Sequence, residues 1–280
     1  MGGQFADLCK VACEVQADIV ACQEHNIDLS QPAAKSILLY DTVRREWTRA
    51  RLSLGSSPIP YNTLYKPGGT LLAVRDHMTG RVIASDSDKW GRWTSVTLRG
   101  RKDSSITIVS APYQVNPDSP CSGQNTAAAQ QRSLMLTVQD PLTYPRAAFV
   151  RDLSEYLRML RQRGDEILLL GDFNETLGGR QSPLTDALSE LNLVQLMSSK
   201  HPSPLPASYT RGKSVWILDS RLIAYRCPCY AVDTRRSARV LPPTIDHVFS
   251  TLTRLYFSAR PLPRCQTRHI VCCMPTTLSN

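Results

Sequence analysis

The sequence contains no apolar run near the roughly 18–20 residues that a helix needs to cross a bilayer. The first ten residues also lack the basic segment, followed by an apolar segment, that is typical of a secretory signal. No internal repeat is visible. We therefore expect an intracellular protein of the nucleus or cytoplasm, neither secreted nor bound to a membrane.

The cysteines lack the patterns of a disulfide framework or a zinc site. There are 9 of them, and an odd number without a secretory signal argues against a secreted, disulfide-linked domain. Cys227-Pro-Cys229 and Cys272-Cys273 are too closely spaced for a zinc ribbon or finger, in which two or more residues usually separate the ligands. We expect reduced thiols, most of them buried.

Positive charge is in excess. The 280 residues carry a net charge of +9, and arginine strongly outnumbers lysine. This balance favours a polyanionic partner such as nucleic acid. The guanidinium of arginine binds phosphate oxygens in a bidentate manner, and binding to a polyanion releases its counterions. A solvated basic surface is the alternative. No obligate protein partner is evident, and the length suits one large domain or two small ones.

The most informative stretch runs from Glu166 to Thr176. Its residues 167–170 form a continuous apolar run, which predicts a strand buried on both faces. Gly171 ends the run, and Asp172 and Asn174 follow at a spacing of two, so in an extended chain their side chains point the same way. Such a pair can hold a phosphate ester, a divalent cation and a water. An Asx-rich turn leaving a core strand is the alternative.

A second buried strand is predicted at Ile19–Cys22, with Gln23 and Glu24 at its carboxyl end, where open α/β sheets place their chemistry. Hydrophobic periodicity and turn signals predict the other elements. The expected helices cover residues 5–17, 35–51, 126–138, 147–163 and 182–191. The expected strands cover residues 70–74, 81–85, 93–98 and 105–111, as an antiparallel meander, and then 215–224, 239–241 and 247–257. We expect one domain over residues 1–258 and a poorly ordered tail over residues 259–280.

Three further residues are candidates for a site. Asp219 interrupts an apolar run and needs a buried partner if it points inward, and His247 is the obvious one. An outward-facing position for Asp219 is the alternative. Arg92 precedes Trp93 and could face a phosphate chain, although a tryptophan that opens a strand usually serves packing.

Four motifs together resemble a known superfamily. They are Cys22-Gln23-Glu24, Gly171-Asp-Phe-Asn174, Trp216-Ile-Leu-Asp219 and Ile245-Asp-His247. In order and spacing, over residues 17–256, they are similar to the metal-dependent endonuclease/exonuclease/phosphatase superfamily, which includes pancreatic DNase and apurinic endonucleases. Within the superfamily, four further stretches look like retroelement-associated members, closest to the LINE-type retrotransposon endonucleases, or like uncharacterised eukaryotic members. They are Lys66-Pro-Gly-Gly-Thr70, Gly91-Arg-Trp93, the helix with Gln130-Gln131, and the stretch from Asp140-Pro to Asp152-Leu153.

The resemblance implies a four-layer α/β sandwich, in which two mostly antiparallel sheets pack face to face with helices outside. It also implies hydrolysis of phosphodiesters with Mg²⁺, or with Mn²⁺ in its place. Glu24 would bind the metal, with Asp246 also near it, and Asp172 would position or deprotonate the attacking water. Asn174 would orient the phosphate. His247, held by Asp219, would contact the phosphate or activate water, and Tyr113 would be a further catalytic residue. Substrate binding would fall to Asn26, Arg92 and Asn174.

The chain departs from the family pattern at three places. Family members usually begin with a core strand that bears an asparagine, whereas this chain starts at the helix that follows it, so we expect a first strand to be missing. Tyr113 is displaced by one residue, which reverses the direction of a strand side chain. Ile245 stands where the family usually has serine. Such losses are what a decaying transposon copy would show.

The leading hypothesis is a DNA endonuclease domain of retroelement origin. An abasic-site nuclease and a phosphoester phosphatase remain alternatives, because the same catalytic set serves all of them. A non-enzymatic pseudo-nuclease that binds nucleic acid through its charge is the alternative from another class. Dependence on Mg²⁺ separates the enzymes from the electrostatic binder.

Overall fold

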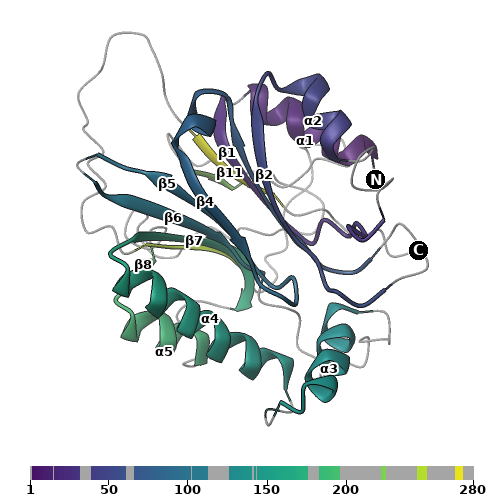
Figure 1. Ribbon diagram of the computed structural model, residues 1–280, viewed down its shortest axis with the longest axis vertical. Helices are drawn as coiled ribbons and strands as arrows, with labels where there is room; N and C mark the ends of the chain where they lie inside the picture. Colours follow the sequence, from purple (N-terminus) through teal and green to yellow (C-terminus); the bar gives the residue numbers. More distant parts are fainter. Residues whose placement is uncertain are drawn as a thin grey trace, which may run out of the picture.

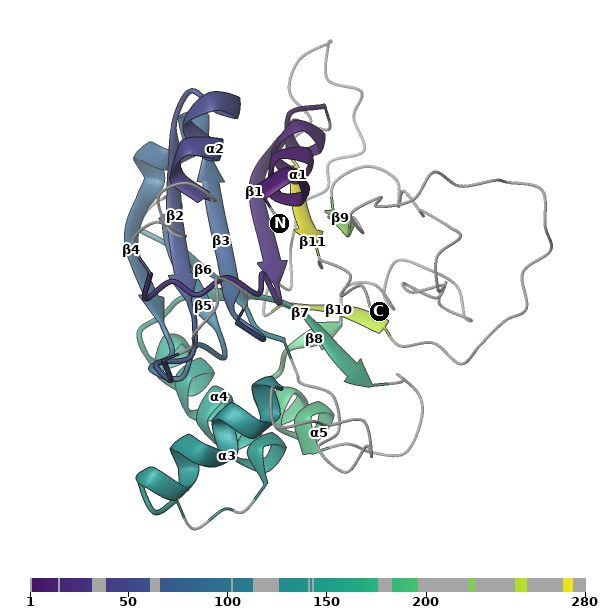
Figure 2. The same ribbon diagram turned by 90° about the vertical axis from the view of Figure 1, so that its right-hand side faces the viewer.

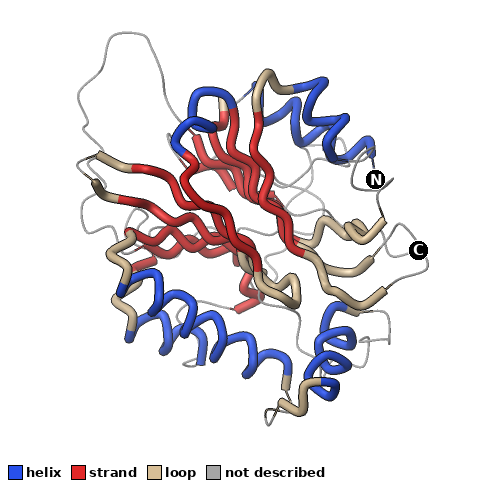
Figure 3. Tube along the Cα trace, viewed as in Figure 1, coloured by secondary structure: helices blue, strands red, loops and turns tan. Residues whose placement is uncertain are grey.

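The chain forms two β-sheets that pack face to face, with helices on the outer surfaces (Figures 1 and 3). The computed structural model describes residues 2–14, 16–31, 39–60, 66–101, 103–112, 126–140, 142, 144–175, 183–195, 222–224, 245–250 and 269–273. Outer helices and two inner sheets make four layers, so the predicted α/β sandwich is confirmed.

The first sheet has the order β2-β3-β1-β11-β9. Its strands are β2 (Ala50–Gly55), β3 (Thr70–Arg75), β1 (Ala17–Gln23), β11 (His269–Cys273) and β9 (Leu222–Ala224). β3 is antiparallel to both of its neighbours, whereas β11 is parallel to both β1 and β9. Helices α1 (Gly2–Glu14) and α2 (Asp41–Glu46) lie on the outer side of this sheet (Figure 1).

The second sheet has the order β4-β5-β6-β7-β10-β8. Its strands are β4 (Val82–Ser87), β5 (Thr94–Arg99), β6 (Ser105–Ser110), β7 (Glu166–Glu175), β10 (Ile245–Ser250) and β8 (Val194–Gln195). β6 and β7 are parallel, and the other pairs are antiparallel. Helices α4 (Pro145–Gln162) and α5 (Pro183–Glu190) cover its outer face, and α3 (Ala127–Thr137) packs against α4.

Strand alternation places apolar side chains on both faces of the central strands. In β1, Val20 and Cys22 pack under the helices, while Ile19 and Ala21 face the other sheet. β7 follows the same rule, because Leu169 packs against the outer helices while its neighbours Leu168 and Leu170 lie between the sheets. The continuous apolar runs of β1 and β7 therefore result from burial on both faces, as predicted.

The predicted helices near residues 126–138, 147–163 and 182–191 are confirmed as α3, α4 and α5. The helix predicted at residues 35–51 is wrong in its last five residues. α2 ends at Glu46, and residues 50–55 form β2. In β2, Leu52 and Leu54 are partly buried against the cluster under the helices, whereas Ser53 is buried. Pairing with β3 outweighs the helical propensity of this stretch.

The predicted four-strand meander is divided between the two sheets. Its first strand, β3, belongs to the first sheet, whereas β4, β5 and β6 form the meander in the second. The short 3₁₀ helix η2 (Asp76–Arg81) stands between β3 and β4 and carries the chain from one sheet to the other. The turn signal at Thr79-Gly80 marks this crossing rather than a hairpin.

The last described segment, β11, lies inside the range predicted as a tail. Its five residues pair with Ala17–Cys22 of β1 on one side and with β9 on the other (Figure 2). The sheet therefore extends beyond residue 258, where the sequence predicts that the domain ends. The predicted strand at residues 239–241 lies outside the described residues. Among the helices that are described, none combines the length and the apolar composition that crossing a membrane requires.

We predict that a chain truncated after residue 258 loses cooperative folding. Removal of β11 would leave the central strand β1 with an unpaired, apolar edge, which promotes aggregation. Size-exclusion chromatography and urea unfolding measure the effect, and a chain truncated after Met274 is the matched control that keeps β11. Equal unfolding midpoints for the two truncated chains would contradict the prediction.

Candidate active site

Two carboxylates from different sheets meet where β1 and β7 end. Glu24 follows β1 directly, Asp172 lies in the last third of β7, and the two strands contact each other across the sandwich (Figure 2). Burial raises the pKa of Glu24, and the negative charge of Asp172 raises it further. The two side chains are therefore close enough to repel each other when both are ionised.

The backbone around Glu24 adopts an uncommon conformation that a second loop holds in place. Glu24 and Asn26 have φ angles of 53° and 56°, in the left-handed region that residues other than glycine seldom adopt. The amide of Glu24 donates a hydrogen bond to the carbonyl of Gly69 at 2.7 Å, and that of Asn26 donates to Gly68 at 2.9 Å. Several contacts thus fix the residue that follows β1.

The side chain of Asn26 belongs to the same support. Its Oδ1 accepts a hydrogen bond from the amide of Gly68 at 2.9 Å, and the residue is buried. Asn26 therefore joins the loop after β1 to the loop before β3. Its substrate contact stays a prediction, and the structure shows a supporting role.

A buried ion pair and a buried histidine complete the support. Lys66 and Asp28 are 1% and 0% exposed, with 3.5 Å between Nζ and Oδ1, and Nζ also donates to the carbonyl of Ser57. The Nδ1 of His25 accepts a hydrogen bond from the amide of Ile27 at 3.1 Å, so we assign the proton to Nε2, which faces the carbonyl of Gly55. Burial lowers the pKa of His25 to about 4, so the ring is neutral at pH 7.

Gly69 is required beside this histidine. Its φ is +89°, and a Cβ atom at this position would lie 2.4 Å from the His25 ring. The roles of Lys66, Asp28 and His25 are not predicted from the sequence. The available signal is the segment Lys66-Pro-Gly-Gly, in which paired glycines beside a lysine indicate a tight backbone approach.

The start of β10 lies beside the end of β7. The two strands are antiparallel, and their register pairs Asp246 with Asp172 and His247 with Gly171. The backbone therefore brings two more predicted site residues to the edge that carries Glu24 and Asp172. The pairing shifts between Ile245 and Asp246, so the register is irregular where β10 passes the end of β7. The side chains of Asn174, Asp246 and His247 lie outside the described part of the structure, as do Tyr113 and Asp219 entirely.

Gly171 allows β6 and β7 to approach closely at this edge. A Cβ atom on Gly171 would lie 1.9 Å from the carbonyl oxygen of Ala111, the residue that follows β6. The amide of Ala111 donates to the carbonyl of Leu170 at 2.9 Å. The glycine that ends the apolar run is therefore needed for the contact between the strands.

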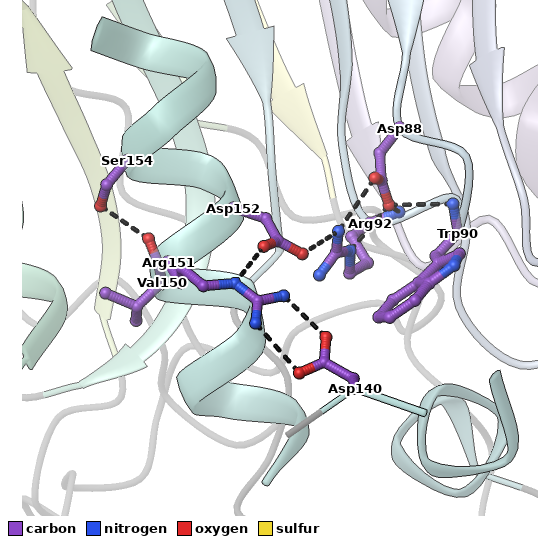
Figure 4. A network of polar contacts seen from close by, with 8 residues as sticks. All are labelled: Asp88, Trp90, Arg92, Asp140, Val150, Arg151, Asp152 and Ser154. Carbon is purple, nitrogen blue, oxygen red and sulfur yellow. Dashed lines mark hydrogen bonds and ion pairs between the residues drawn. The ribbon is translucent and has the colours of Figure 1, made fainter. Parts of the chain in front are cut away.

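Arg92 is buried in a structural network instead of facing an open site (Figure 4). Its guanidinium contacts Asp88 at 2.7 Å and Asp152 at 2.8 Å, and it is 2% exposed. It also stacks on Trp90 and Trp93, at 4.5 and 4.8 Å from their ring centroids. These contacts correct the expectation of a substrate-binding arginine, because its charge is already balanced by two carboxylates.

The same network continues onto the surface of α4. Arg151 contacts Asp152 at 2.6 Å and Asp140 at 2.7 Å (Figure 4). The Arg151 guanidinium lowers the pKa of Asp140 to about 2. The network ties the segment before β5 to α4, the helix that covers β7.

The chemistry of Glu24 and Asp172 fits a hard divalent cation. A cation between them would remove the repulsion that raises the pKa of Glu24, and carboxylate oxygens are the ligands that Mg²⁺ prefers. No group of three or more His, Cys, Asp or Glu suited to a metal occurs among the described residues. Mg²⁺ does not need such a group, because it keeps several of its waters.

Comparison with known proteins gives a match to one family model. Residues 3–269 match the model of the endonuclease/exonuclease/phosphatase family. No match was found among curated proteins.

The solved structures that are similar to this chain include an exonuclease, an AP endonuclease and a further catalytic domain. A 3'-5' exonuclease from Neisseria meningitidis is 17% identical, with a TM-score of 0.48 over 88% of this chain and 82% of that one. An AP endonuclease from Archaeoglobus fulgidus is 13% identical, with a TM-score of 0.48 over 87% and 80%. The APE2 catalytic domain from Xenopus laevis is 12% identical, with a TM-score of 0.49 over 88% and 78%. Identities this low say nothing about the substrate.

We predict that Lys66→Met destabilises the protein by about 3 kcal/mol, because it leaves the Asp28 carboxylate buried without its cation. Urea unfolding measures the loss. The double variant with Asp28→Asn should recover part of it, since the uncompensated charge is then removed. Additive losses in the double variant would show that the two side chains do not interact.

For Arg92→Met we also expect a loss of about 3 kcal/mol in the free energy of unfolding, since Asp88 becomes a buried, unpaired charge. Arg151→Met is the control. Its side chain is 42% exposed, so solvent screens its ion pairs with Asp140 and Asp152, and its loss should cost less than the loss of Arg92. Equal losses in the two variants would refute the structural role assigned to Arg92.

Proposed function

The chain belongs to the endonuclease/exonuclease/phosphatase family, and we propose that it is a Mg²⁺-dependent phosphodiester hydrolase that cuts DNA. The observation that carries the proposal is the pair formed by Glu24 and Asp172. They come from strands in opposite sheets, yet the charge of Asp172 acts on the pKa of Glu24. Two carboxylates held together at strand ends are suited to a metal ion.

In this proposal Glu24 and Asp172 would hold the Mg²⁺ ion, with Asp246 beside them through its pairing with Asp172. The bound metal would neutralise charge that develops on the phosphate oxygens. Mn²⁺ would serve in its place.

The chain's own groups would handle the water and the phosphate. Asp172 would position the attacking water or take its proton, and Asn174 would orient the phosphate. His247 lies at the start of β10, next to Gly171 in the register, and would contact the phosphate or activate water. We keep Asp219 as the group that orients His247, and Tyr113 as a further catalytic group, as proposals from the sequence motifs.

Nucleic acid is the substrate class that the charge supports. The net charge of +9 favours a polyanion, and arginines on the surface would contact the phosphates that flank the scissile bond. We propose DNA, and a retroelement origin, on the basis of the sequence motifs alone. A nucleus or cytoplasm location is part of the same proposal.

Supercoiled plasmid provides the test. We expect nicking with Mg²⁺ that EDTA abolishes, and a loss of roughly 10²–10⁴-fold in rate for Asp172→Asn and for Glu24→Gln. The matched control is Glu155→Gln, which removes an exposed carboxylate from α4 and should leave the rate unchanged. Circular dichroism checks that each variant is folded. Nicking that survives EDTA or Asp172→Asn would overturn the proposal.

The same preparations separate the alternatives. A phosphatase would release phosphate from p-nitrophenyl phosphate with Mg²⁺ and leave the plasmid intact. A pseudo-nuclease would bind DNA without cutting it, and its affinity would fall with salt but not respond to EDTA.

A further inference from the structure

The interface between the two sheets changes from apolar to polar toward the edge that carries Glu24. Most of it is an apolar cluster that includes Ile19, Leu72, Val96 and Leu168. At the end nearest Glu24 the facing side chains are instead polar and buried, namely Gln23, Ser53, Thr70, Thr94 and Ser110. Buried polar groups are costly unless they are paired, so this layer calls for an explanation.

One hydrogen bond in this layer joins β1, which Glu24 follows, to β6, the parallel neighbour of β7. The Nε2 of Gln23 donates to the Oγ of Ser110 at 2.8 Å, and both side chains are 0% exposed. Gln23 is the last residue of β1 and immediately precedes Glu24. Ser110 is the last residue of β6 and pairs with Leu170, two residues before Asp172.

Backbone contacts connect this hydrogen bond to the segments that carry Glu24 and Asp172. On one side, Gln23 directly precedes Glu24 in the chain, and the backbone amide of Glu24 is held by the carbonyl of Gly69. On the other side, the amide of Ala111 bonds to Leu170, and Gly171 packs directly against the carbonyl of Ala111. Because of these contacts, the distance between the two sheets at this point affects the positions of Glu24 and Asp172.

We infer that Gln23 and Ser110 are positioning residues, whose hydrogen bond across the sandwich sets the separation of Glu24 and Asp172. The inference rests on the proposed function, because the separation matters only if the carboxylates share a cation. Mg²⁺ and Mn²⁺ bind best at short, well-defined distances, and supporting hydrogen bonds typically change metal affinity by 10–100-fold. Apolar packing is non-directional, so it does not set this distance by itself.

A second hydrogen bond of the same kind gives a matched control. The Oγ of Ser53 and the Oγ1 of Thr94 are 2.5 Å apart and also join the two sheets. They belong to β2 and β5, and neither candidate ligand follows these strands directly. Loss of this bond should weaken the sandwich to a similar degree without moving Glu24 relative to Asp172.

The experiment measures Mn²⁺ binding to the full chain by calorimetry, together with unfolding in urea. Ser110→Ala should weaken Mn²⁺ binding by about 10-fold, whereas Ser53→Ala should change it by less than about 2-fold despite a similar loss of stability. Gln23→Leu should match Ser110→Ala. The double variant should be no weaker than either single variant, because both remove the same hydrogen bond.

Three outcomes would overturn the inference. Wild-type affinity in Ser110→Ala would show that the hydrogen bond does not position the ligands. Equal weakening in Ser110→Ala and Ser53→Ala would indicate general loosening of the sandwich. Failure of the unmutated protein to bind Mn²⁺ would overturn the proposed metal site and this inference together. If the unmutated protein binds Mn²⁺ and either of the first two outcomes is found, only the inference fails.

Discussion

Apolar packing between the two sheets is the constraint on which the rest of the structure depends. β1 and β7 are buried on both faces, so their interior positions accept only apolar side chains. Polar groups can enter these strands only where the strands end. A site that needs carboxylates from both sheets is therefore restricted to the edge where β1 and β7 end together. The packing that stabilises the fold also determines where its chemistry can take place.

The region around Glu24 contains several features that are unfavourable for the free energy of folding. The backbone at Glu24 and Asn26 is left-handed, Lys66 and Asp28 are buried as ions, and Glu24 is close to a second carboxylate. Each of these features destabilises the folded chain in isolation. They persist because the loop at Gly68 and Gly69 and the neighbouring strands fix this region from several directions. Strain concentrated around a pair of carboxylates is what a functional site shows more often than a structural turn.

The sequence predicts elements better than it predicts their partners. The periodicity of α4 and the apolar run of β7 are local signals, and the structure agrees with both. The place of β3 and β11 in the first sheet is not local. An alternating segment does not show which strand it will pair with, and the short apolar run at residues 269–273 stands among prolines and arginines that suggest a loop. Residue types therefore identified Glu24 and Asp172 as candidates, whereas the support by His25 and Lys66 depends on pairing between residues 24–28 and 66–69.

Arg92 shows why residue type alone does not assign a role. In the sequence it is a cation beside an aromatic residue, as phosphate-binding groups often are. In the fold, Asp88 and Asp152 reach it from two different elements and occupy its charged edge. Glu24 is the opposite case, because burial and the charge of another carboxylate, Asp172, both raise its pKa. An arginine already paired with carboxylates has little to offer a phosphate, while a carboxylate repelled by another carboxylate has much to gain from a cation. The effect of one carboxylate on the other, more than the presence of a charged residue, marks the end of β1 as the place where a cation would bind.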